Sequence, residues 1–200
     1  VIIGIHSGCG VFISQFWGKG DKNNIRKVLL TGLVASVVVA VLFMVPALFY
    51  SEGVVTIFND EASVVSEGAI YLKIVCTSYI FTAMSFGYGF ACRSIGNALI
   101  PMIASVIGLV SNTVLNYILI FGKLGAPVMG VSGAAIATVI ARAVEMLVIM
   151  GYIYISGNSV LAVRLKELKG ISKEFVVKVF KTVIPVVLNE SSWALGFVAY

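Results

Sequence analysis

Four ionisable side chains stand inside long apolar runs of this sequence, where a charge could bind ions or substrates away from bulk water. They are Lys73, Arg142, Glu145 and Glu190. A charge at the centre of a lipid bilayer costs roughly 2.5–3.5 kcal/mol even on the lenient insertion scale, so each is a functional candidate. Lys73 lies near the end of its run, where a long side chain reaches the interface, and we interpret it as structural.

Glu190 is the strongest of these candidates. About eleven residues separate it from Val179, where its apolar run begins, which places it about 16 Å into a core of ~30 Å. No basic residue lies within one helical turn, so we expect its carboxyl group to bind a proton or a cation such as Na⁺. The alternative is a structural carboxylic acid, hydrogen-bonded to a neighbouring helix with help from Asn189 and the two serines that follow. Pro185, one turn earlier, can kink the helix beside such a site.

Two other groups of polar residues are placed by helical spacing. Arg142 and Glu145 are three apart, so they share a helix face, and we interpret them as a structural ion pair, with a transport site as the alternative. Asn112 and Asn116 are four apart and face the same way. They could give carbonyl oxygens to a sodium ion, or simply hydrogen-bond to another helix for about 0.6 kcal/mol per bond. Thr138 is a weaker candidate, because threonine often bonds back to its own helix.

The remaining reactive residue types indicate packing rather than chemistry. His6, the only histidine, stands beside Gly4 and Gly8, whose spacing favours close helix contact. The three cysteines lie within apolar runs without the CxxC spacing of a metal or redox site: Cys9, Cys76 and Cys92. No GxxxxGK[ST] loop, HExxH or Ser/His/Asp set occurs. The sequence therefore predicts no enzyme, no ATP-driven pump, no cofactor and no fixed metal beyond a possible Na⁺ at Glu190.

These residues must be positioned by membrane helices. Hydrophobic residues make up 60% of the chain, charged residues only 12%, and the mean hydropathy is +1.05, far from the usual soluble balance. Five runs are long enough to cross a bilayer, and a sixth resembles the tail of another. They are Val28–Tyr50, Ala69–Cys92, Leu99–Phe121, Val131–Ile155, Val179–Tyr200 and Val1–Trp17. We therefore predict an all-α, polytopic transmembrane bundle of about six segments, read as an internal fragment because the chain lacks an initiator methionine and ends inside an apolar run.

The loops between these runs alternate in charge. The loop Trp17–Val28 is basic, whereas the loop Ser51–Gly68 carries four acidic residues and no lysine or arginine. The positive-inside rule then places the first, third and fifth loops in the cytoplasm, where lipid headgroups account for the net charge of +5 without nucleic acid. Residues 157–178 form a basic connector, either an amphipathic helix on the inner surface or an ordinary loop.

The most specific motif is NTVLNYILIFG at Asn112–Gly122, followed by GVSGAAIAT at Gly130–Thr138. It is supported by SQFWG at Ser14–Gly18, by RSIG at Arg93–Gly96 with Pro101 and Met102, and by Pro185 with Glu190 and Trp193. Together these motifs resemble the multidrug and toxic compound extrusion (MATE) family. The resemblance runs from the family's second helix to the start of its seventh.

The resemblance implies an antiporter of twelve helices in two six-helix lobes, which exports bulky, often cationic organic compounds in exchange for Na⁺ or H⁺ by alternating access. Residues 1–156 would form most of the first lobe, 157–178 the connector and 179–200 the first helix of the second lobe. Glu190 would match an acidic ion-coupling residue, and Asn112, Asn116 and Thr138 the first lobe's cation site. In some relatives the position of Asn116 is an aspartate, so that charge is missing here.

The same resemblance suggests Tyr117, Asn189 and Trp193 as residues of the substrate cavity. It implies a multi-pass protein of a bacterial or archaeal plasma membrane, whose partners are a small organic substrate and membrane lipids; the oligomeric state stays open. The first alternative is a flippase of lipid-linked precursors, which should line its cavity with arginine and lysine, and here only Arg142 qualifies. The second alternative is a non-transporting membrane scaffold.

Overall fold

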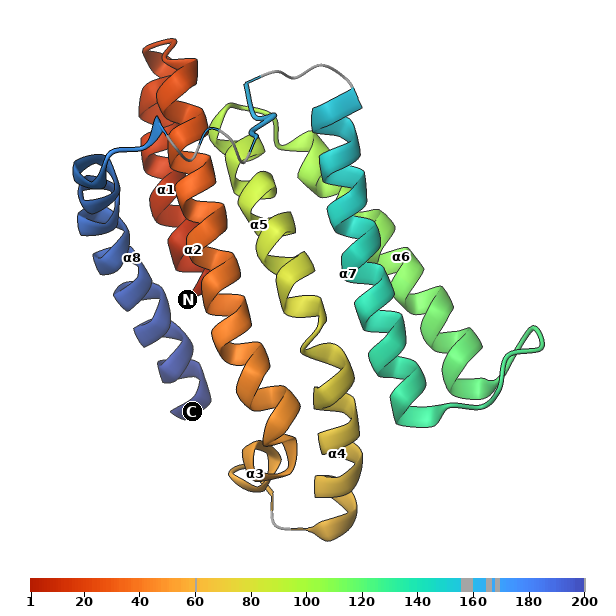
Figure 1. Ribbon diagram of the computed structural model, residues 1–200. Helices are drawn as coiled ribbons and strands as arrows, with labels where there is room; N and C mark the ends of the chain where they lie inside the picture. The colour runs from red at the N-terminus through yellow and green to blue at the C-terminus, as the bar shows by residue number, and fades with distance from the viewer. Residues whose placement is uncertain (60, 156–159, 165–166, 168–169, 200) are drawn as a thin grey trace. The chain divides into compact units, whose positions relative to one another are not determined.

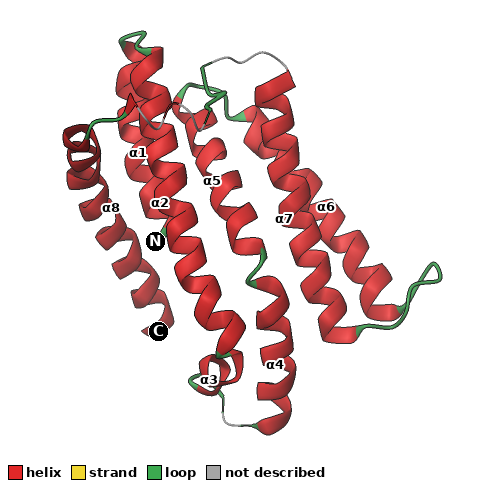
Figure 2. Cartoon of the chain, in the orientation of Figure 1, coloured by secondary structure: helices red, strands yellow, loops and turns green. Residues whose placement is uncertain are grey.

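The computed structural model describes residues 1–59, 61–155, 160–164, 167 and 170–199. These residues form helices and loops without a strand, which confirms the all-α prediction (Figures 1 and 2). The helices are α1 (Ile2–Gly18), α2 (Lys22–Phe49), α3 (Ser51–Thr56), α4 (Ala62–Val75), α5 (Ser78–Ser94), α6 (Leu99–Phe121), α7 (Gly130–Ile155) and α8 (Lys173–Ala199).

Three helices within the described residues, α2, α6 and α7, are long and apolar enough to cross a membrane by themselves. The consecutive helices α4 and α5 make a fourth span if they are taken together. Helix α1, with 17 residues, and α8, which contains the polar run Asn189–Ser192, are not among these three helices. The predicted bounds of α6 match the structure, and those of α7 differ by one residue.

The segment Ala69–Cys92, predicted as one span, is broken into α4 and α5, whose axes differ by 51°. At the break, Thr77 Oγ1 donates to the Ile74 carbonyl and Ser78 Oγ to the Val75 carbonyl, both at 2.7 Å. These hydroxyl groups satisfy carbonyl oxygens at the end of α4, as any break inside a membrane requires. Hydropathy does not register such local bonds, so the sequence predicted an apolar segment here but not the bend within it.

Helices α2 and α8 begin six residues before their predicted starts, because polar residues cap them. Asp21 Oδ1 accepts a hydrogen bond of 3.1 Å from the Asn24 backbone N–H, and Ser172 Oγ one of 3.3 Å from the Phe175 N–H. Such side chains replace the missing partners of a helix's first turn. The lysines at 173 and 178, assigned by sequence to the connector, therefore lie within α8.

The rest of the connector, for which the sequence allowed either an amphipathic helix or an ordinary loop, is described only in part, since residues 157–159, 165–166 and 168–169 lie outside the described residues. Val160, Leu161 and Val163 are buried in turns and irregular backbone. Arg26 of α2 holds this segment, with Nε donating to the Val160 carbonyl at 3.3 Å and Nη1 lying 3.5 Å from Glu167 Oε1.

The chain divides into two compact units. The first comprises Val1–Val39, Ala83–Met102 and Ile149–Tyr200, and the second Ala40–Thr82 and Ile103–Val148. In the first unit α1 packs against α8 through Gly4 and Gly8, as their spacing predicted. His6 is buried and stacks on the Phe90 ring with a centroid distance of 6.5 Å. All three cysteines are buried and unpaired, which agrees with their predicted packing role.

In the second unit, small residues bring α6 and α7 together. Ala104, Ala135, Ala137 and Ala141 are buried along these two helices. A Cβ atom on Gly133 would lie 2.8 Å from the Leu119 backbone, so only glycine permits this approach. Small residues allow membrane helices to pack closely. This contact sets the distance between the polar side chains that the two helices carry.

Candidate functional site

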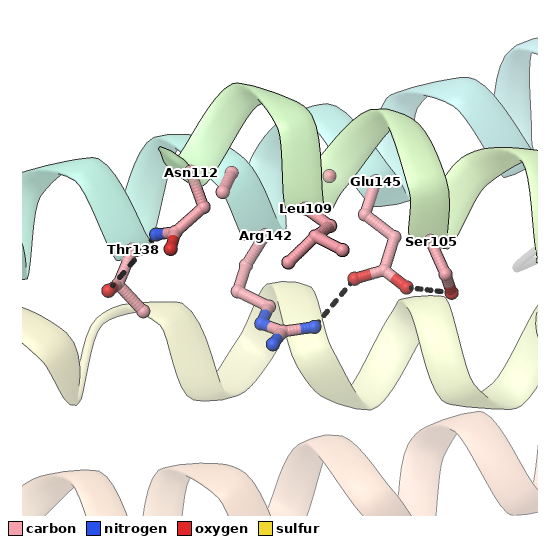
Figure 3. A pocket seen from close by; sticks show the side chains of 8 residues that line it. Ser105, Leu109, Asn112, Thr138, Arg142 and Glu145 are labelled. Carbon is pink, nitrogen blue, oxygen red and sulfur yellow. Dashed lines mark hydrogen bonds and ion pairs between the residues drawn. The ribbon is translucent and has the colours of Figure 1, made fainter. Parts of the chain in front are cut away.

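A polar cavity of about 310 Å³ lies between α6 and α7 in the second unit (Figure 3). Its lining residues are Ser105, Gly108, Leu109, Asn112, Thr138, Ala141, Arg142 and Glu145. The small side chains of Gly108 and Ala141 leave room for the cavity. The polar residues of its lining provide hydrogen-bonding groups. Four residues predicted from the sequence as site members or ion-pair partners therefore line this cavity. Thr138, Arg142 and Glu145 come from α7, and Asn112 comes from α6.

At one end of this site, three predicted residues form a hydrogen-bonded series. Asn116 Nδ2 donates to Asn112 Oδ1 at 3.0 Å, and Asn112 Nδ2 donates to Thr138 Oγ1 at 3.5 Å. The Thr138 hydroxyl in turn donates to the Ala134 carbonyl of its own helix at 2.9 Å, as expected for threonine. Asn116 Oδ1 is buried and has no hydrogen-bond partner among the described residues. The series thus confirms the shared face of the two asparagines and leaves one amide oxygen available.

At the other end, Arg142 and Glu145 form the predicted ion pair. Arg142 Nη1 lies 2.7 Å from Glu145 Oε2, and Glu145 Oε1 accepts a hydrogen bond of 2.9 Å from Ser105 Oγ of α6. The Glu145 side chain is 9% exposed and that of Arg142 is 45% exposed. Sequence reasoning missed Ser105, because its partner lies 40 residues away on another helix and no local spacing marks it.

The other candidate residues lie elsewhere. Glu190 is half-buried on α8 in the first unit and takes part in no ion pair among the described residues. Asn189 and Trp193 are exposed on the same helix. Tyr117 is exposed on α6 in the second unit, with its ring 6.0 Å from that of Phe121. None of these four residues lines the polar cavity. That Tyr117, Asn189 and Trp193 contact the substrate stays a prediction.

A second cavity, of about 410 Å³, lies in the first unit and is mostly apolar. Its lining residues are Leu30, Leu33, Val34, Val37, Val38, Met84, Tyr88, Met150, Tyr154 and Val163. The Tyr154 hydroxyl donates to the Val163 carbonyl at 2.7 Å, so the Tyr88 hydroxyl, 3.0 Å away, is the donor to Tyr154. No local pattern in the sequence predicts this pair, because 66 residues separate its members.

The MatE family model matches residues 1–118 of the 200-residue chain. The chain belongs to the MatE family. This family comprises transporters rather than enzymes, and its members are integral membrane proteins. The match covers α1 to α5 and most of α6, including both asparagines of the hydrogen-bonded series.

Curated relatives and solved structures agree with this assignment. A probable multidrug resistance protein of Bacillus subtilis, YoeA, is 28% identical over 76% of this chain and 33% of its own length. The multidrug export protein MepA of Staphylococcus aureus is 27% identical over 95% of this chain and 40% of its own length. A MATE structure in the bent conformation has the same fold, with a TM-score of 0.86 and 22% identity over 98% of this chain and 43% of that one. The MatE chain thus spans about a third to two fifths of these proteins.

The oxygen atoms that line the polar cavity of this MatE chain belong mostly to neutral groups. Within the described residues, no three His, Cys, Asp or Glu side chains gather as a metal-ligand set. The polar cavity instead offers amide and hydroxyl oxygens, beside a carboxylate that is already paired with arginine. Such neutral oxygens suit a hard, weakly held monovalent cation better than a transition metal.

Proposed function

We propose that the full-length protein is a secondary antiporter that exports bulky organic compounds, often cationic ones, in exchange for Na⁺ or H⁺. The curated relatives named above are multidrug resistance and export proteins, which supports the substrate class. The observation that carries the proposal is the series Asn116–Asn112–Thr138, held between two membrane helices with the buried Asn116 Oδ1 left without a protein partner. Relatives from Bacillus and Staphylococcus support a bacterial plasma membrane as its location.

Two places on the chain would handle the coupling ion. In the first lobe, Asn112, Asn116 and Thr138 would hold a cation through side-chain oxygens. In the second lobe, the Glu190 carboxyl group would bind Na⁺ or a proton, because a half-buried acid without an ionic partner among the described residues retains that capacity. Ion binding would favour one arrangement of the transporter and substrate binding the other, so that the two compete.

Flippase activity toward lipid-linked precursors has less support. A large anionic substrate calls for several basic residues, and among the residues that line the two described cavities only Arg142 is basic. In a scaffold, Glu190 and the two asparagines would only hold helices together, and Asn116 Oδ1, which has no partner among the described residues, gives such a role less support.

The test is dye efflux from proteoliposomes that contain the full-length protein, under imposed sodium or proton gradients. We expect one gradient to drive efflux of a cationic dye, and Glu190→Gln to abolish it while the protein still folds. Asn59→Gln, in the loop after α3, serves as the control because Asn59 is exposed. Failure of both gradients to move any cationic dye would reject the antiporter and favour a flippase or scaffold.

A further inference from the structure

Arg142 presents a guanidinium group to the polar cavity from the middle of a membrane helix. It is the thirteenth of the 26 residues of α7, about 20 Å from either helix end at 1.5 Å per residue. Figure 3 shows it between the hydrogen-bonded pair Asn112–Thr138 and the pair Glu145–Ser105. An arginine at this depth has a high cost, so a role in binding is expected by default.

The ion pair to Glu145 uses only a small part of this group. A guanidinium carries five N–H donors, and among the described residues Arg142 makes one contact, from Nη1 to Glu145 Oε2. Glu145, by contrast, has both oxygens engaged, one by Arg142 and the other by Ser105. The unused hydrogen-bonding capacity of this end of the cavity therefore consists of donors, held in position by a buried acid.

A planar oxyanion is the ligand group that fits such donors, since a guanidinium matches carboxylate and phosphate geometry in bidentate fashion. The charges of the cavity also limit the net charge that its ligand can carry. Arg142 and Glu145 together are neutral, so a net charge on the ligand would enter the membrane interior without compensation. A ligand with an oxyanion at one end and a cationic group at the other keeps the cavity neutral.

We propose that this polar cavity binds zwitterionic organic substrates, with their carboxylate or phosphate group held by Arg142. The proposal rests on the export function proposed above and narrows its substrate class, bulky organic compounds, to zwitterionic ones at this cavity. Glu145 acts as a positioning residue, because it touches Arg142 rather than the ligand. The depth of Arg142 favours a substrate over a lipid headgroup, which would remain at the interface about 20 Å away.

The test compares two probes that differ only at the oxyanion: a rhodamine with a free carboxylate, which is a zwitterion, and its methyl ester, which is a cation. Their binding to the purified full-length protein in detergent is measured by fluorescence anisotropy. We expect the wild type to bind the carboxylate form about tenfold or more tightly than the ester. In Arg142→Gln this ratio should fall to about one, through weaker binding of the carboxylate form.

Because Arg142→Gln leaves the Glu145 carboxylate unpaired, the double variant Arg142→Gln/Glu145→Gln guards against a folding defect and should show the same loss of preference. Arg142→Lys keeps the charge without the planar fork and should retain part of the preference. The control is Arg93→Gln, because Arg93 lies in the first unit with its guanidinium 4.7 Å from the Phe90 ring centroid. It should keep the full ratio.

Equal binding of the two dyes by the wild type overturns the proposal, as does an unchanged ratio in the folded double variant. An excess of short-chain phosphatidylglycerol that displaces the carboxylate dye while other zwitterions do not would reassign the site to lipid and overturn it as well. The antiporter proposal is judged separately by the gradient-driven efflux assay. A cationic dye exported without any carboxylate preference would leave that proposal standing and reject this one.

Discussion

Gly4 of α1 lies directly against Val187 of α8, so closely that a Cβ atom on Gly4 would be 2.8 Å from Val187 Cα. One turn along, a Cβ atom on Gly8 would be 3.0 Å from Val183 Cα. Both neighbours are backbone atoms, which cannot rotate away as the end of a side chain can. The first and last helices of the first unit therefore meet through a glycine groove on α1.

Gly4→Ala is expected to destabilise the protein by about 1–3 kcal/mol, because the added methyl group must push two helix backbones apart. Gly151→Ala on α7 is the matched control, since a Cβ atom there meets nothing within 4 Å. That variant should be neutral or slightly stabilising, because alanine favours a helix by up to about 1 kcal/mol over glycine. Thermal unfolding of both variants in detergent makes the comparison. Equal melting temperatures would show that the close contact is not maintained.

Arg142→Met is expected to cost about 3 kcal/mol of stability, because it leaves a buried carboxylate without its cation. The double variant Arg142→Met/Glu145→Met should recover most of this loss, since it removes both charges together. The measurement is a double-mutant cycle by chemical unfolding in mixed micelles. Additive costs of the two substitutions would contradict a coupled pair.

Asn116→Asp is expected to tighten binding of the coupling cation. The substitution keeps the size of the side chain and places a negative charge beside Asn112 and Thr138, where Asn116 now has an unpartnered oxygen. The cation concentration for half-maximal efflux should fall roughly tenfold, equivalent to about 1.4 kcal/mol. Asn97→Asp, in the loop before α6, is the control outside the site. If the cation concentration for half-maximal efflux is unchanged in Asn116→Asp, the coupling cation does not bind at Asn116.

Asp21 is expected to make the start of α2 sensitive to acid. Hydrogen bonds from the Asn24 backbone and side chain lower the pKa of this exposed carboxyl group. Its contribution is therefore fully present above the unfolded pKa of about 3.9 and is lost as the pH falls through the lower folded pKa. Hydrogen–deuterium exchange of the Asn24 amide, corrected for intrinsic rates, should show this loss. Asp21→Asn keeps the cap without the titration and should remove the pH dependence.

Much of the fold was predictable because long apolar runs and helix periodicity are local properties. The bounds of α6 followed from hydropathy alone, and the pairs Arg142–Glu145 and Asn112–Asn116 followed from spacings of three and four. The early start of α2 and the break after Val75 were not predicted, because they depend on single hydrogen bonds of polar side chains.

Contacts between helices were the part of the site that sequence reasoning could not supply. Ser105 reaches Glu145 only because α6 and α7 pack face to face through small residues, and no spacing along one helix encodes that choice. The bond between Tyr88 and Tyr154 is hidden for the same reason. Residues suggested only by family resemblance, such as Tyr117 and Trp193, lie in different compact units, and their common role stays a prediction.

At the break between α4 and α5, where hydroxyl groups bond to the last carbonyl oxygens of α4, the shape of the segment and its free energy of insertion depend on different residues. The total apolar content of a segment determines its free energy of transfer into lipid, whereas its bend lies where the Thr77 and Ser78 hydroxyl groups bond to carbonyl oxygens of α4. Threonine and serine change the transfer energy little compared with a charged residue. In such proteins the shape of a span can therefore diverge through one or two substitutions while its insertion during synthesis is preserved.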